Sequence, residues 1–156
     1  MYINTEEFEN HLDINTEQLE KIASVLLTDF YDEQPEFTLT FVKPETIREL
    51  NRSYRDVDAV TDVLSFESDG EYDPENGLEY LGDILICYEQ VRKQAELSGH
   101  STDDEIALME IHGLLHLLGY DHMDEKQKNE MWEYQNLYLE KCGVHLNRCP
   151  GEDFDF

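Results

Sequence analysis

Apolar residues recur at intervals of three and four in five stretches of the chain, which is the spacing that buries one face of a helix. These helices are predicted to begin near residue 16, at Pro44, near residue 88, after Ser101 or Thr102, and near residue 124. The buried faces of the first two comprise Leu19, Ile22, Ala23, Leu26 and Phe30, then Ile47, Leu50 and Tyr54. Gly119 and Gly143 stand where a glycine would end the last two helices.

Alternation of apolar and polar residues predicts a half-buried strand at 36–42, with Phe37, Leu39 and Phe41 on one face. Residues 63–66 and 81–87 are predicted to form two further strands, separated by an acidic surface loop at 68–77. Helices outnumber strands and do not alternate with them regularly. We therefore expect an α+β fold in which several helices cover a small mixed sheet, with residues 1–156 forming one metal-binding domain. The pattern leaves the strand order open.

The charge of the chain is strongly negative, because 11 Lys and Arg face 37 Asp and Glu for a net charge of −26. Such a field argues against a broad, non-specific nucleic-acid surface but permits a small, locally positive site. The acidic start and the absence of a long apolar run predict a cytoplasmic protein without a membrane span. Three cysteines argue against a disulfide framework, and the spacing of Cys142, His145 and Cys149 matches no common zinc module.

Three histidines within eleven residues carry the clearest chemical signal. His112 and His116 lie one helical turn apart, so both imidazoles can converge on one ion. Gly119 can turn the chain so that His122 returns as a third ligand. Three imidazoles with an open fourth position are typical of catalytic rather than structural zinc sites, where a bound water reaches a pKa near 7. Nickel, copper and iron also suit three imidazoles, so the identity of the metal stays open.

Gly113 lies inside this helix, where glycine costs about 1 kcal/mol relative to alanine. It indicates that another group approaches the backbone closely at this point. The histidine spacing is also that of the metzincin metalloproteases, in which a glutamate acts as general base beside the first histidine. Because Gly113 occupies that position, a small metalloprotease is the lesser alternative.

Arg48, Arg52 and Arg55 fall on one face of the second predicted helix, where they could hold a phosphodiester against the metal. For Arg48 and Arg52 we expect pairing with nearby carboxylates instead. Asp121 and Asp83 are candidates for orienting a ligating imidazole. The aromatic residues of the last helix are expected to pack rather than to stack on bases; these are Trp132, Tyr134 and Tyr138.

Three blocks of the chain are similar to the YbeY family of bacterial rRNA-maturation endoribonucleases. They are Asn51-Arg52-Ser53-Tyr54-Arg55 followed by Thr61-Asp62-Val63-Leu64-Ser65-Phe66, then Leu81-Gly82-Asp83-Ile84-Leu85-Ile86-Cys87, and the segment from His112 to His122. The chain departs from the family pattern at Val60 and Glu67, where the family usually has proline, and lacks the lysine that some members carry after the arginine.

The resemblance implies an α+β domain in which His112, His116 and His122 hold one divalent ion, with zinc as the first choice. It implies a metal-dependent, single-strand-specific endoribonuclease that acts in ribosomal RNA maturation, at the 3′ end of the small-subunit rRNA, and in ribosome quality control. Arg55 matches an arginine in the family's RNA-binding cleft, so Arg55 and His116 are the expected catalytic residues.

Two alternatives remain. One is a ribosome-associated assembly factor with a structural metal and little or no catalysis, and the other is the metalloprotease. The charge of −26 further predicts weak affinity for free RNA. Productive binding is therefore expected to depend on the ribosome or on basic ribosomal proteins.

Overall fold

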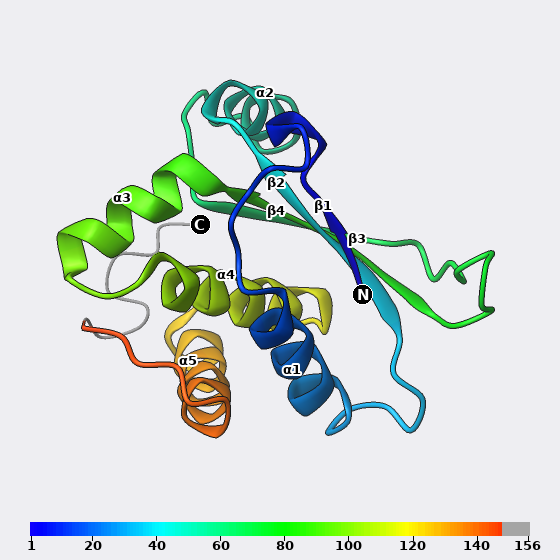
Figure 1. The fold of residues 1–156 in the computed structure, drawn as a ribbon. Helices are drawn as coiled ribbons and strands as arrows, with labels where there is room; N and C mark the ends of the chain where they lie inside the picture. The colour runs from blue at the N-terminus through cyan, green and yellow to red at the C-terminus, as the bar shows by residue number, and fades with distance from the viewer. Residues whose placement is uncertain (148–156) are drawn as a thin grey trace.

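A four-stranded mixed sheet lies between one helix on one face and a layer of helices on the other (Figure 1). The computed structural model describes residues 1–147. The strands are β1 (Tyr2–Asn4), β2 (Glu36–Val42), β3 (Val63–Glu67) and β4 (Tyr80–Cys87), in the order β1-β2-β4-β3. β1, β2 and β4 are parallel, whereas β3 pairs antiparallel with β4 and forms an edge of the sheet.

The helices form two layers of unequal size. They are α1 (Thr16–Leu27), α2 (Pro44–Arg55), α3 (Tyr88–Ser98), α4 (Thr102–Leu117) and α5 (Glu125–Lys141), with a short 3₁₀ helix, η1 (Glu6–Phe8). α4 packs on β3 and β4, and α1, α3 and α5 pack against α4, while α2 contacts β4 from the opposite face. The predicted α+β class, with several helices on a small mixed sheet, is confirmed.

Most predicted elements occur where the sequence pattern places them. Ser101 is the residue that caps α4, since its hydroxyl accepts a hydrogen bond from the Asp104 N–H at 3.0 Å. Asp124 caps α5 in the same way, through the Gln127 N–H. The pattern did not predict β1 or η1, because three residues are too few to show a period.

Two side chains expected on buried helix faces lie elsewhere. Tyr54 is 70% exposed, because the last turn of α2 reaches the edge strand β3 and no further strand of residues 1–147 lies beyond it to cover the ring. α2 buries Asn51 instead, whose amide donates to the Ala59 carbonyl. α1 ends at Leu27, so Phe30 falls in the following turn and is 36% exposed.

The cysteines give no sign of a disulfide framework within the described residues. Cys87 and Cys142 are buried, free thiols. Cys149, the third cysteine, lies outside the described residues. The aromatic residues of α5 pack as predicted, with Tyr138 buried and Trp132 and Tyr134 half-buried against the core. No helix within residues 1–147 is long and apolar enough to cross a bilayer.

Gly113 allows α4 to approach β4 more closely than any other residue would permit. A Cβ atom at this position would lie 2.8 Å from Cγ2, 2.9 Å from Cδ1 and 3.0 Å from Cγ1 of Ile84. The group that the sequence predicted to approach this backbone is therefore the Ile84 side chain. On the neighbouring strand, the Ser65 hydroxyl donates to the Gly113 carbonyl at 3.4 Å.

We predict that Gly113→Ala lowers the free energy of unfolding of the metal-free protein by about 1 kcal/mol. Overpacking costs about 1–3 kcal/mol, which outweighs the gain of about 1 kcal/mol in helix propensity. In an Ile84→Ala background, the same substitution should be neutral or stabilising because the crowding atoms are gone. Urea denaturation of the four proteins in this double-mutant cycle measures the coupling, and equal effects in both backgrounds would contradict the packing explanation.

Candidate metal centre

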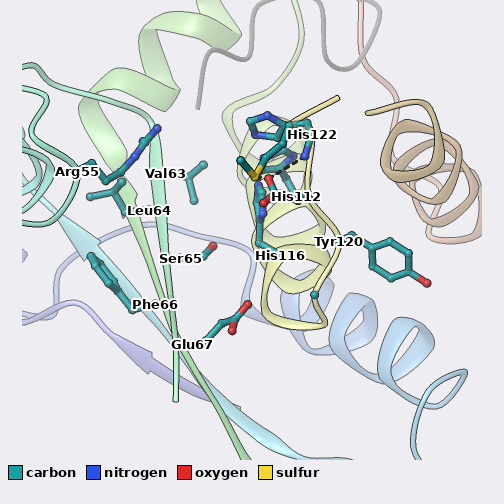
Figure 2. A pocket seen from close by; sticks show the side chains of 13 residues that line it. Arg55, Val63, Leu64, Ser65, Phe66, Glu67, His112, His116, Tyr120 and His122 are labelled. Atoms are coloured by element: carbon teal, nitrogen blue, oxygen red, sulfur yellow. Dashed lines mark hydrogen bonds between the residues drawn. The ribbon is translucent and has the colours of Figure 1, made fainter. Parts of the chain in front are cut away.

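The first two histidines of the cluster belong to a helix that is buried almost throughout. Apart from His116, every residue of α4 from Glu105 to Leu117 is buried. His112 is fully buried and His116 is half-buried, one turn further along the same face. Their Nε2 atoms lie 3.1 Å apart, so both rings present the same nitrogen to one point (Figure 2).

A left-handed glycine returns the chain toward this point. Gly119 adopts φ 101° after the last turn of α4. Its N–H donates to the His116 carbonyl and the Tyr120 N–H donates to the Leu115 carbonyl, which is the hydrogen-bond pattern of a Schellman cap. The His122 N–H then donates to the Asp121 carboxylate at 2.8 Å. The predicted turn at Gly119 is therefore present, and it brings His122 back beside the helix that it has just left.

The three imidazoles form one group. One ring nitrogen of each histidine lies within 4.8 Å of the corresponding nitrogens of the other two. Metal–nitrogen bonds of about 2.1 Å in a tetrahedral site would put the ligand nitrogens about 3.4 Å apart. The 3.1 Å between His112 and His116 is close to that value, and His122 needs only a small shift to match it. The donor set and its spacing therefore fit a divalent ion.

A glutamine that the sequence analysis did not identify orients His112. The Oε1 atom of Gln135, a fully buried residue of α5, lies 2.5 Å from Nδ1 of His112. A carbonyl oxygen can only accept, so Nδ1 carries the proton and Nε2 keeps its lone pair for a metal. Of the two candidates named from the sequence, Asp121 accepts from the His122 backbone N–H and interacts electrostatically with His116, whereas Asp83 accepts from the Tyr80 hydroxyl.

Burial keeps His112 and His116 neutral. It is the main cause that lowers the pKa of His112 well below its usual value, with a further contribution from the nearby His116. Burial, followed by the proximity of His122, lowers the pKa of His116 to about 4. Because a metal binds only the neutral form of histidine, these two side chains are ready to act as ligands at pH 7 without losing a proton.

The histidines form one wall of a cavity of about 630 Å³, and β3 forms the opposite wall (Figure 2). Val63, Ser65 and Glu67 lie on the side of β3 that faces α4, and Leu64 and Phe66 lie on the other side. All five residues of β3 line the cavity, so it extends over the edge of the sheet and reaches both faces of the strand.

The backbone of β3 also faces this cavity. The Cys87 N–H donates to the Asp62 carbonyl and the Ser68 N–H donates to the Leu81 carbonyl, so the even-numbered residues of the strand bond to β4. In an antiparallel pair, the intervening residues direct their N–H and C=O groups the other way. The cavity therefore contains an open strand edge, with which no other strand of residues 1–147 pairs, formed by the backbone of Val63, Ser65 and Glu67.

Only one of the three arginines on α2 reaches the cavity. Arg48 pairs with Asp58 at 2.8 Å and Arg52 pairs with Glu49, as predicted for both. Arg55 lines the cavity, and no carboxylate of residues 1–147 forms an ion pair with it. Its positive charge adds to the lowering of the His116 pKa, which places the guanidinium within electrostatic reach of the histidine cluster.

Comparison with known proteins assigns the chain to a family. The profile of the endoribonuclease YbeY family matches residues 3–143. Endoribonuclease YbeY of Staphylococcus carnosus is 38% identical over 148 residues, which cover 90% of this chain and 97% of that protein. Endoribonuclease YbeY of Bacillus cereus is 44% identical over 142 residues, covering 87% and 89%. The solution structure of TM1509 from Thermotoga maritima shares the fold with a TM-score of 0.54 and 29% identity, covering 90% of this chain and 88% of that one. The chain belongs to the endoribonuclease YbeY family.

Proposed function

We propose that this protein is a metal-dependent endoribonuclease that cleaves single-stranded RNA during ribosomal RNA maturation, at the 3′ end of the small-subunit rRNA, and in ribosome quality control. The observation that carries the proposal is the convergence of three imidazoles opposite Arg55, which pairs with no carboxylate of residues 1–147, in one cavity. Membership of the endoribonuclease YbeY family supports the choice of RNA as substrate. Residues 1–156 act, in this proposal, as one hydrolase domain in the cytoplasm.

The proposed metal ligands are His112, His116 and His122, and the proposed ion is zinc. Three imidazole ligands are typical of catalytic zinc sites that keep one position for solvent. Such an ion supplies a Lewis acid for a phosphoryl oxygen and activates water at neutral pH. Gln135 holds the His112 ring so that Nε2 points at the site, and the half-buried His116 presents its nitrogen to the cavity.

Arg55 is proposed to hold the scissile phosphate and to offset the charge that develops on it. An arginine can bind two phosphate oxygens at once, and its guanidinium remains protonated in any protein environment. Since Arg48 and Arg52 are already paired with carboxylates, Arg55 is the arginine of α2 that remains available for an anion. Arg55 and His116 are thus the proposed catalytic residues, Arg55 on the substrate and His116 on the ion.

The negative charge of the protein bears on its partners. A net charge of −26 repels free RNA before the RNA can reach the cavity that contains Arg55. We therefore propose that the ribosome or its basic ribosomal proteins bring the RNA to the site, because those proteins are attracted by the same field. The metalloprotease alternative is not supported, since Ile84 fills the space where a glutamate in place of Gly113 would begin.

Removing the acceptor of His112 should weaken metal binding. We expect Gln135→Leu to lower zinc affinity by about 10- to 100-fold, because the His112 ring loses the group that fixes its tautomer. Asn136→Leu, at the exposed neighbouring position of α5, serves as the control and should bind zinc as the wild type does. Competition with a chromogenic chelator measures both. A folded Gln135→Leu protein with unchanged affinity would show that Gln135 has no such role.

Reversing the charge of Arg55 should impair cleavage without impairing metal binding. We expect Arg55→Ala to lower kcat/KM on a single-stranded RNA by about 100- to 1000-fold, and Arg55→Glu by more, with full zinc content. Arg52→Ala removes an exposed arginine that already has a partner and should change kcat/KM by less than about threefold. Equal losses in the Arg52 and Arg55 variants would point to general electrostatics rather than to a specific contact.

Removal of the metal by a chelator distinguishes the proposed endoribonuclease from the alternative of an assembly factor with a structural metal. If the proposal is right, chelation abolishes RNA cleavage, zinc restores it in the wild type, and zinc does not restore it in His116→Ala. A structural metal would instead lower the Tm and ribosome binding together, with no cleavage to lose at any stage. Elemental analysis of the purified protein identifies the ion, and cleavage by metal-free His116→Ala would exclude the proposed mechanism.

A further inference from the structure

We propose that Tyr54 selects single-stranded RNA by stacking on the base next to the phosphate that Arg55 holds. The inference rests on the proposed function and assigns a specificity role to a residue outside the metal centre. It starts from a side chain that helix periodicity would bury and that the structure exposes: Tyr54 projects from the last turn of α2 with 70% of its surface accessible.

The exposed ring is braced from one side. Tyr54 and Phe66 have ring centroids 5.3 Å apart and an interplanar angle of 69°, an edge-to-face contact. Such a contact fixes the orientation of a ring while leaving the remainder of its surface accessible. Phe66 is itself a lining residue of the cavity, so the Tyr54 ring stands directly beside the cavity rather than on a remote surface.

The cavity leads from the metal ligands to Phe66, the residue against which this ring packs. It begins at His112 and His116, takes in Ser65 and Glu67 on the near side of β3, and continues to Leu64 and Phe66 on the far side (Figure 2). Arg55 lies along this route and is the immediate neighbour of Tyr54 in the chain. A phosphate bound between Arg55 and the metal therefore has one of its two adjoining nucleotides on the side of Tyr54.

Base stacking is a suitable way for a strongly negative protein to bind single-stranded RNA. The attraction between a base and an aromatic ring does not require positive charge, whereas additional phosphate contacts would need cations that this chain has in small number. A duplex has its base faces already stacked inside the helix and offers them to no side chain. A ring beside the cleavage site consequently favours unpaired nucleotides, and the preference for single strands follows from the position of one tyrosine.

The test compares Tyr54→Ala with a matched control. Tyr72 is 69% exposed but belongs to the connection between β3 and β4 rather than to α2, so Tyr72→Ala removes an equally exposed tyrosine elsewhere. Cleavage of a fluorescent single-stranded RNA and of its duplex is measured for the zinc-loaded wild type, Tyr54→Ala, Tyr54→Phe and Tyr72→Ala. A second measurement follows the fluorescence of 2-aminopurine in a cleavage-resistant phosphorothioate RNA, which is quenched when the base stacks.

We expect Tyr54→Ala to raise KM for the single strand by about 10- to 100-fold, with kcat changed by less than about threefold and zinc content unchanged. Its preference for single strand over duplex should fall by the same factor, and quenching of 2-aminopurine should be lost. Tyr54→Phe keeps the ring and should behave as the wild type does, as should Tyr72→Ala. An abasic nucleotide beside the cleaved bond should remove the difference between wild type and Tyr54→Ala.

The inference is overturned if the wild type cleaves RNA and Tyr54→Ala retains the wild-type KM, strand preference and quenching. It is also overturned if Tyr72→Ala raises KM as much as Tyr54→Ala does, since a general surface effect would then explain both. Failure of the proposed function looks different: the wild type would not cleave RNA at all. Quenching that depends on Tyr54 would in that case still support the stacking contact.

Discussion

The approach of α4 to the sheet at Gly113 is the constraint on which the site depends. Because Ile84 occupies the space of a missing side chain, the axis of α4 lies close to β4. His112 and His116 flank this contact on the same helix, so their height above β3 follows from it. Interiors are packed tightly enough that a shift of this helix would move both imidazoles relative to Arg55, which is held by another helix on the opposite face. A glycine without any chemical role thus sets the width of the reactive cavity.

The metal centre obtains its properties from the helices around it rather than from surrounding charges. Burial lowers the pKa of His112 and of His116, and one amide oxygen from α5 determines which nitrogen of His112 carries the proton. Among residues 1–147, Arg55 of α2 is the one Lys or Arg that lines the cavity, and it lies across the cavity from the cluster. In the proposed function, the metal ligands and the residue that binds the substrate therefore belong to different elements, which is why we expect substitutions at Gln135 and Arg55 to separate metal affinity from turnover.

The extent to which the sequence predicted this arrangement follows from how local each signal is. The spacing of His112 and His116 and the turn at Gly119 involve interactions within a few residues, and both could be read from the pattern. Gln135 is 23 residues from His112 on another helix, and no periodicity connects the two.

The error at Tyr54 has a similar origin, because a helical pattern identifies the inward face but not where the sheet beneath it ends. The sequence pattern did not predict β1, because the position of this strand is fixed by pairing with β2, more than thirty residues away. Interactions within a few residues could be predicted from the sequence, whereas contacts between distant segments could not.

The open edge of β3 has a consequence beyond the reaction itself. An edge strand with outward-directed backbone groups is a template on which another copy of the same strand can add, and many proteins cover such edges or place charges along them. Here the proposed function requires the edge to remain accessible, because it lines the cavity in which we propose that the substrate binds. The excess of carboxylates, which hinders the approach of RNA, also drives two copies of the chain apart. The acidity of this protein can thus be understood as protection against self-association, at an edge that the proposed activity does not allow it to cover.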